Sequence, residues 1–167
     1  MAGACVGESL SDTGEVMAPG PGRLLRLLAD AEAVTWSLLL IGMALKYLTR
    51  TTDLGVSIAG PIHGFVFLAY CVVVVVVAVD QRWRATTLLL GLFSAVPPFL
   101  TILFERSVRR TGQAGDRWRL REAGAARSAP ERALHAVLRR PVVWAVVALV
   151  AVAAVFTVLL RLGPPVG

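Results

Sequence analysis

Charged residues are missing from a long stretch in the middle of this 167-residue sequence. Residues 56–79 contain no Asp, Glu, Lys or Arg. A helix of that length is about 36 Å long, which is enough to cross a hydrocarbon core of about 30 Å. The missing charge therefore predicts a transmembrane helix, and His63 is the one ionisable side chain in its first half.

Catalytic motifs are also missing. The sequence contains no H-E-x-x-H, no Walker loop and no G-x-G-x-x-G, which excludes the usual signatures of zinc proteases and nucleotide-binding enzymes. The two cysteines, Cys5 in a polar tail and Cys71 in an apolar run, are expected to lie too far apart for a disulfide. We predict a protein that is not an enzyme and carries no cofactor.

Apolar residues, by contrast, are abundant. They make up 56% of the chain, and the mean hydropathy is +0.70. They fall into four blocks joined first by short loops, which makes the first three helices antiparallel neighbours. The predicted fold class is all-α, a polytopic membrane bundle with a three-helix core and a fourth C-terminal transmembrane helix. The expected spans are Leu24–Tyr47, Val56–Val79, Ala85–Phe104 and Val142–Leu160.

The segments between and around these spans have their own patterns. We expect a disordered tail over 1–22, a three-helix domain over 23–106, an Arg-rich loop over 107–141, a fourth span over 142–161 and a tail over 162–167. Within the loop, Ser128 and Glu131 have the spacing of a capping box. This predicts a short amphipathic helix near 129–140 on the membrane surface; the alternative is a solvated linker.

The positive charge is concentrated. Residues 105–141 hold ten Arg, and the net charge of the whole chain is +6. We interpret this basic loop as a contact for anionic lipid, with no role in binding nucleic acid. Basic residues favour the cytoplasmic side. With four spans, the distribution of Lys and Arg between the two sides predicts a multi-pass protein of the bacterial inner membrane, with both termini outside and loop 105–141 in the cytoplasm.

Polar residues within the spans are the candidate site. Each of the first three helices carries one polar or small stripe, which should face the bundle interior. Depths counted from the helix ends predict two layers, the first holding Lys46, His63, Thr101 and Glu105, and the second Glu32, Tyr70 and Thr87. On this count, no direct contact between Glu32 and His63 is expected.

The role of His63 has several interpretations. It could be a structural histidine, a proton relay or ligand sensor, or a haem or metal ligand. A metal site is not predicted, because no second histidine lies in a span. Pro61 could be the first-turn proline of a helix that begins at Gly60, or mark a half-helix. Pro97 and Pro98 must kink or shorten the third helix.

Three blocks carry a family resemblance: residues 31–47, 60–70 and 97–106. They resemble a family of small bacterial integral membrane proteins of unknown function over about residues 24–108. The family pattern corresponds here to Glu32, Lys46, Tyr47, His63, Gly64, Phe67, Tyr70, Pro98, Phe99, Glu105 and Arg106. The resemblance implies three spans, with the fourth an addition, and it implies no known activity.

Two functional hypotheses follow. The first is an accessory or interaction subunit of the inner membrane, which binds a membrane-protein partner or forms a homo-oligomer. The alternative is a small-solute or proton pathway that uses the polar layer around His63. A membrane enzyme or haem protein ranks third.

Overall fold

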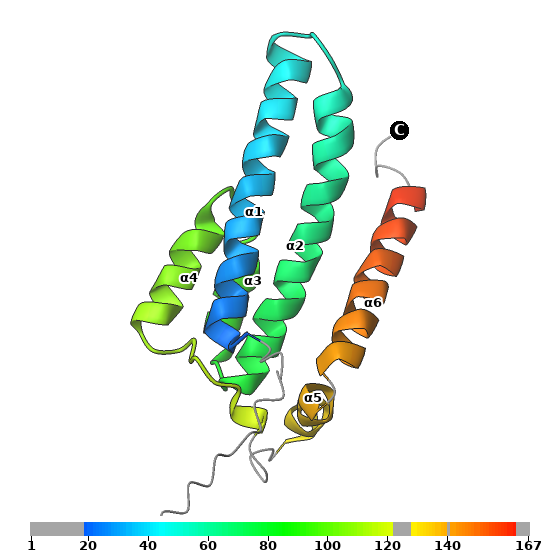
Figure 1. Ribbon diagram of the computed structural model, residues 1–167. Helices are drawn as coiled ribbons and strands as arrows, with labels where there is room; N and C mark the ends of the chain where they lie inside the picture. The colour runs from blue at the N-terminus through cyan, green and yellow to red at the C-terminus, as the bar shows by residue number, and fades with distance from the viewer. Residues whose placement is uncertain (1–18, 122–127, 140, 163–167) are drawn as a thin grey trace, which may run out of the picture.

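A computed structural model describes residues 19–121, 128–139 and 141–162, and every regular element in them is helical. The all-α helical bundle is therefore confirmed (Figure 1). Most of the predicted tails, 1–22 and 162–167, lies outside the described residues, as does Cys5. The elements are α1 (Pro21–Met43), a π-helical turn η1 (Ala44–Leu48), α2 (Leu54–Asp80), α3 (Ala85–Phe93), α4 (Leu100–Arg110), a 3₁₀ turn η2 (Arg119–Arg121), α5 (Ala129–Arg139) and α6 (Pro141–Leu162).

The two long helices form an antiparallel hairpin. Pro21 opens α1, where its missing N–H costs nothing. Near the connecting loop the backbones of α1 and α2 are in close contact. A Cβ atom added at Gly42 would lie only 2.7 Å from the carbonyl carbon of Gly55. Two stretches are long and apolar enough to cross a membrane, Pro21–Leu48 and Leu54–Asp80, and α6 contains a shorter apolar stretch, Val146–Val158.

The prediction of one helix over 85–104 is wrong. After α3 the chain turns at 94–99, and α4 returns in the opposite direction beside α1 (Figure 1). Pro97 and Pro98 cannot donate backbone hydrogen bonds, and Phe99 has a left-handed φ of 66°. These residues end one helix and start another, so the third element is a helical hairpin and not one continuous helix.

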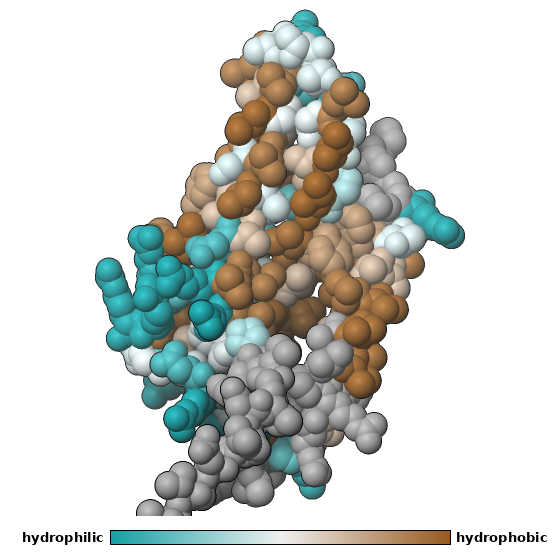
Figure 2. All heavy atoms as spheres, viewed as in Figure 1, coloured by the Kyte–Doolittle hydropathy of each residue, from teal (hydrophilic) through white to brown (hydrophobic). Residues whose placement is uncertain are grey.

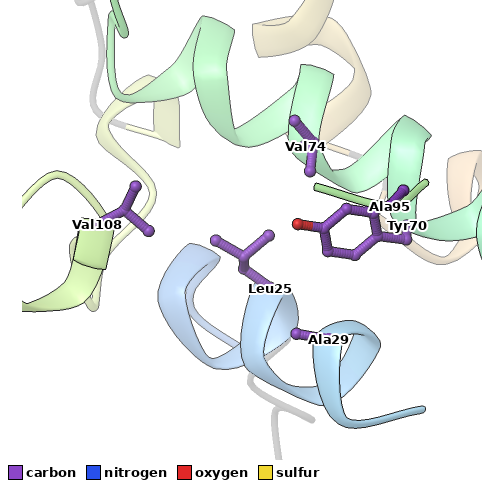
Figure 3. Packing of buried hydrophobic residues seen from close by; sticks show 6 residues of the cluster. All are labelled: Leu25, Ala29, Tyr70, Val74, Ala95 and Val108. Atoms are coloured by element: carbon purple, nitrogen blue, oxygen red, sulfur yellow. The ribbon is translucent and has the colours of Figure 1, made fainter. Parts of the chain in front are cut away.

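This hairpin completes the apolar core. Tyr70 and Val74 of α2 pack with Leu25 and Ala29 of α1, and with Ala95 and Val108 from the two arms of the α3–α4 hairpin (Figure 3). The core occupies the half of the molecule in which α1 begins. The other half consists of the rest of the α1–α2 hairpin, with the end of α6 (Pro141–Leu162) beside α2 (Figure 1).

The C-terminal part begins at the base of the bundle. Helix α5 coincides with the predicted amphipathic helix, and its capping box is present: the Ser128 amide donates to Glu131 Oε2 (3.1 Å), and the Glu131 amide donates to Ser128 Oγ (3.4 Å). Helix α6 then runs back along α2, where Phe156 packs on Gly64. The start of α1 and the end of α6 therefore point to opposite ends (Figure 1). The prediction that both termini lie on one side of the membrane counted 85–104 as a crossing, and it stays a prediction.

Neither interpretation of Pro61 matches the structure. Helix α2 begins at Leu54 and continues unbroken through Pro61 to Asp80. A Cβ added at Gly60 would meet nothing within 4 Å, so this glycine makes no close helix contact. Of Gly60 and Gly64, only Gly64, one turn further along, packs against another helix.

Candidate functional site

The polar centre of the bundle is formed by Glu32, Thr35 and His63. Glu32 is completely buried, and His63 Nδ1 lies 3.8 Å from its Oε2 atom. The Thr35 hydroxyl donates to the Glu32 carbonyl (3.1 Å), and its oxygen lies 3.1 Å from His63 Nδ1. Thr35 therefore links the backbone of Glu32 to the imidazole of His63.

Aromatic rings enclose the histidine. The Trp36 ring lies 4.5 Å from the His63 ring, centre to centre, and Phe67 follows at 6.4 Å. Trp36 Nε1 also donates to the carbonyl of Ala95 (3.4 Å), which lies in the turn between α3 and α4. The polar centre is thus in contact, through one side chain, with the irregular backbone of 94–99.

The expectation that Glu32 and His63 do not meet is wrong. Their register is set by the contact of Gly42 with Gly55. Glu32 precedes Gly42 by about 15 Å of helix and His63 follows Gly55 by about 12 Å, so the two side chains are level. Counting from the helix ends failed because η1, which follows α1, extends beyond the level at which α2 starts.

The predicted layer around His63 does not form. Lys46 lies in η1, at the outer end of the hairpin, and its Nζ is 3.6 Å from Asp53 Oδ1. Thr101 and Glu105 lie toward the start of α1, because α4 runs back in that direction. The Thr101 hydroxyl donates to the Ala29 carbonyl (3.4 Å).

The second predicted layer is also wrong in its partners. Tyr70 is fully buried, and its hydroxyl lies 3.0 Å from Ser94 Oγ. Ser94 uses its own proton on the Gly91 carbonyl (2.7 Å), so Tyr70 is the donor. This bond fixes the end of α3 to α2. Glu32, another member of the predicted second layer, lies beside His63 instead.

A buried carboxylate with few partners determines the chemistry that this site can support. Neither Glu32 oxygen has a hydrogen-bond partner among the described residues. The same part of the chain contains no group of three His, Cys, Asp or Glu side chains placed to hold a metal ion. An acid paired with one imidazole inside a membrane bundle can instead hold or pass a proton.

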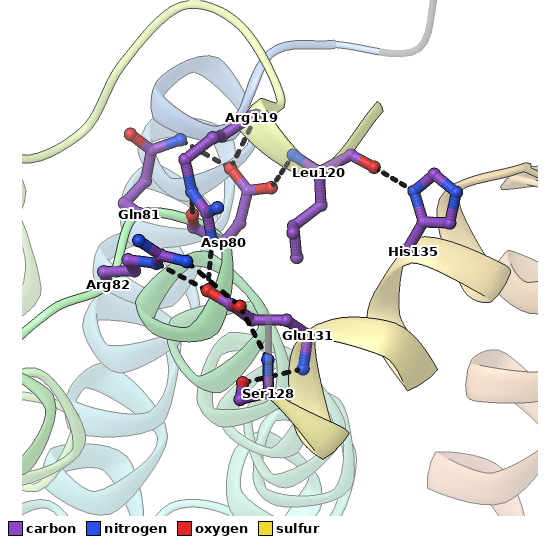
Figure 4. A network of polar contacts seen from close by, with 8 residues as sticks. All are labelled: Asp80, Gln81, Arg82, Arg119, Leu120, Ser128, Glu131 and His135. Atoms are coloured by element: carbon purple, nitrogen blue, oxygen red, sulfur yellow. Dashed lines mark hydrogen bonds and ion pairs between the residues drawn. The ribbon is translucent and has the colours of Figure 1, made fainter. Parts of the chain in front are cut away.

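A second polar cluster, not predicted from the sequence, lies at the base (Figure 4). The buried carboxylate of Asp80 accepts from the amides of Leu120 (3.0 Å) and Arg119 (3.2 Å) and from Gln81 Nε2 (2.5 Å). Glu131 accepts from Arg82 Nε (2.6 Å) and Arg119 Nη2 (2.6 Å). In the sequence, Asp80 directly follows the charge-free run and Glu131 belongs to the capping box, but neither pattern predicts that the two carboxylates lie in one cluster.

The surface has two characters. Apolar residues cover the long hairpin and α6, whereas hydrophilic residues gather around α4 and the base (Figure 2). Exposed apolar side chains also lie in and beside the turn at 94–99, among them Phe93, Val96 and Phe99. This distribution is typical of helices surrounded by lipid.

Comparison with known proteins identifies the family. A model described as "Domain of unknown function (DUF3817)" matches residues 22–110. The chain belongs to this family. The DUF3817 match confirms the resemblance over 24–108, covers the α1–α2 and α3–α4 hairpins, and ends before α5 and α6.

A relative from Streptomyces coelicolor (strain ATCC BAA-471 / A3(2) / M145) is named "Putative membrane protein SCO5905". It is 49% identical over 98 residues, which are 56% of this chain but only 12% of the relative's length. No solved structure matches the chain. Together with the two membrane-length helices, these findings describe a DUF3817 membrane protein of unknown activity.

Proposed function

We propose that this chain is an interaction subunit that docks another membrane-protein segment against its re-entrant turn. The observation that carries the proposal is the position of 94–99. Helix α3 starts at the base and rises by about 14 Å, so the turn lies near mid-membrane. Irregular backbone at that depth is tolerated only where protein or a water-filled cavity covers it.

Only part of the turn is covered by the chain itself. Ala95 and Ser94 are buried, and Trp36 binds the Ala95 carbonyl. The side chains of Val96 and Phe99 are about half exposed, at 56% and 44%. A protein surface over this side would remove the irregular backbone from lipid, and the apolar side chains around it suit a transmembrane helix as partner.

The length of the relative supports the same proposal. Its matched segment is 12% of the protein, so there the module is joined to much additional polypeptide.

For membrane orientation, we infer that the base of the bundle is cytoplasmic in the bacterial plasma membrane. Among the described basic residues, Lys46, Arg50 and Arg161 lie toward the opposite end, and the other twelve lie at or toward the base. This imbalance favours a cytoplasmic start of α1 and an external end of α6. Reporter domains fused after residues 112 and 167 should report opposite sides; the same side would contradict it.

Photo-crosslinking tests the docking proposal. A benzophenone amino acid at Val96 or Phe99 should form adducts with protein in intact membranes. The matched control is Val75, exposed to a similar extent but on α2, where lipid adducts are expected. A dimer-sized adduct identifies a second copy. If Val96 and Phe99 form only lipid adducts, as Val75 does, the proposal fails.

A second candidate function, a proton pathway, rests on the Glu32–His63 pair. Glu32 is buried at the level of His63 and has no hydrogen-bond partner among the described residues. Intramembrane ionisable residues often mark proton relays. Proton flux into proteoliposomes should fall at least tenfold (about 1.4 kcal/mol) in Glu32→Gln and His63→Ala, with Asp30→Asn, on the exposed side of α1, as control. Flux equal in all variants would exclude this function.

A further inference from the structure

We propose that a cavity beside the start of α1 binds a phosphate group, supplied by the phosphodiester headgroup of a bilayer lipid. The cavity has a volume of about 520 Å³. It lies between the first turns of α1, the end of α4 and residues 114–116. This is the level at which α1 enters the apolar part of the bundle, so a headgroup and the cavity share the same depth.

Three guanidinium groups line the cavity, those of Arg23, Arg26 and Arg109. Each guanidinium has five N–H donors in a planar fork that matches phosphate oxygens. Arg109 Nε lies 3.1 Å from Glu105 Oε1, and Arg26 Nε lies 3.8 Å from Asp30. These ion pairs orient the two side chains and leave further donors on each fork for a ligand.

The charge of the cavity suits a monoanion. The three arginines are opposed by two lining carboxylates, Glu105 and Asp116. The lining residues alone leave one excess positive charge, and Arg26 is also shared with Asp30 outside the lining, so a singly charged phosphodiester suits the cavity better than a polyanion. Glu105 is 4% exposed. Its ion pair therefore orients Arg109, and the ligand contacts the exposed guanidinium groups.

The walls of the cavity are fixed by close backbone contacts. A Cβ added at Gly20 would lie 2.0 Å from the Asp116 carbonyl oxygen, and the Gly22 amide donates to the Gly115 carbonyl (3.1 Å). Trp118 Nε1 donates to the Pro19 carbonyl (2.9 Å). The start of α1 and the segment after α4 are therefore locked together before any ligand arrives, which lowers the entropic cost of binding.

Lipid titration tests the site. The full chain, in a phosphate-free maltoside detergent, is titrated with dioleoylphosphatidylglycerol and followed by native mass spectrometry. One lipid should bind saturably. The variant Arg23→Gln/Arg26→Gln should bind at least about tenfold more weakly, because two charge-assisted contacts are lost. Arg110→Gln, an exposed arginine of α4 outside the cavity, is the matched control and should bind within about twofold of the parent.

Two further arms complete the design. Ala114→Phe fills the cavity without changing charge, and it should also weaken binding if the lipid enters the cavity. Dioleoylglycerol, which lacks the phosphate, should bind at least about tenfold more weakly than the phospholipid. Unchanged binding in the double variant and in Ala114→Phe would overturn the site. Inorganic phosphate that binds as tightly as the lipid would overturn the assignment to a membrane headgroup.

Discussion

Two buried carboxylates, one in the middle of the bundle and one at its base, are treated very differently. Asp80 and Glu32 are both completely buried. Asp80 accepts three hydrogen bonds from N–H groups at the base, whereas Glu32 accepts none from the described residues and has only His63 at 3.8 Å. A satisfied buried carboxylate stabilises a fold, and an unsatisfied one costs free energy. The base is therefore a structural latch, and the centre is the better functional candidate.

The largest effect is expected at the latch. Asp80→Asn places an amide group against N–H donors and removes the charge that they solvate. We expect a loss of about 3 kcal/mol in the free energy of unfolding, measured by denaturation in mixed micelles. Asp53→Asn, an exposed change at the outer loop, is the control and should have little effect. Equal stability of the two variants would remove the distinction between base and centre.

The centre should respond in the opposite direction. Glu32→Met replaces a carboxylate without hydrogen-bond partners by an apolar side chain of similar length. The free energy of unfolding should rise by about 1 kcal/mol in the same assay. A loss as large as that of Asp80→Asn would mean that Glu32 is a structural acceptor, and its candidacy as a proton site would end.

The smallest effect is expected between the two regions. Tyr70→Phe removes one buried hydrogen bond, to Ser94, and leaves the bond from Ser94 to Gly91 in place. A single hydrogen bond between membrane helices contributes about 0.6 kcal/mol, so a comparable loss in unfolding free energy is expected. Ser94→Ala should cost at least as much, because it also removes the bond to the Gly91 carbonyl, and the double variant should cost no more than Ser94→Ala alone if the Tyr70–Ser94 bond acts as a pair.

The sequence predicted elements better than it predicted contacts. The long α1 and α2, the amphipathic α5 and its cap at Ser128 follow from apolar runs and local spacing. The break at Pro97 and Pro98 was recognised, but its size was not. A kink and a reversal need the same residues, and only the packing of Val108 and Ala95 against α1 and α2 selects the reversal.

The candidate site shows the same limit. Glu32, His63 and Tyr70 were predicted to face the interior, and all three are buried. Their partners were predicted wrongly, because depth was counted from helix ends. The register depends on one backbone contact, Gly42 against Gly55, and a slip of one turn moves a side chain by about 5 Å.

The sequence by itself determined that this chain is helical, membrane-bound and a member of DUF3817, since composition, periodicity and local motifs are sufficient for those conclusions. Only the tertiary structure decided that Glu32 meets His63, that α3 and α4 form a hairpin, and that Asp80 anchors the base. The physical reason is that helix propensity is local, whereas register and reversal depend on contacts between residues far apart in the chain, such as Thr35 with His63, 28 positions apart, and Thr101 with Ala29, 72 positions apart.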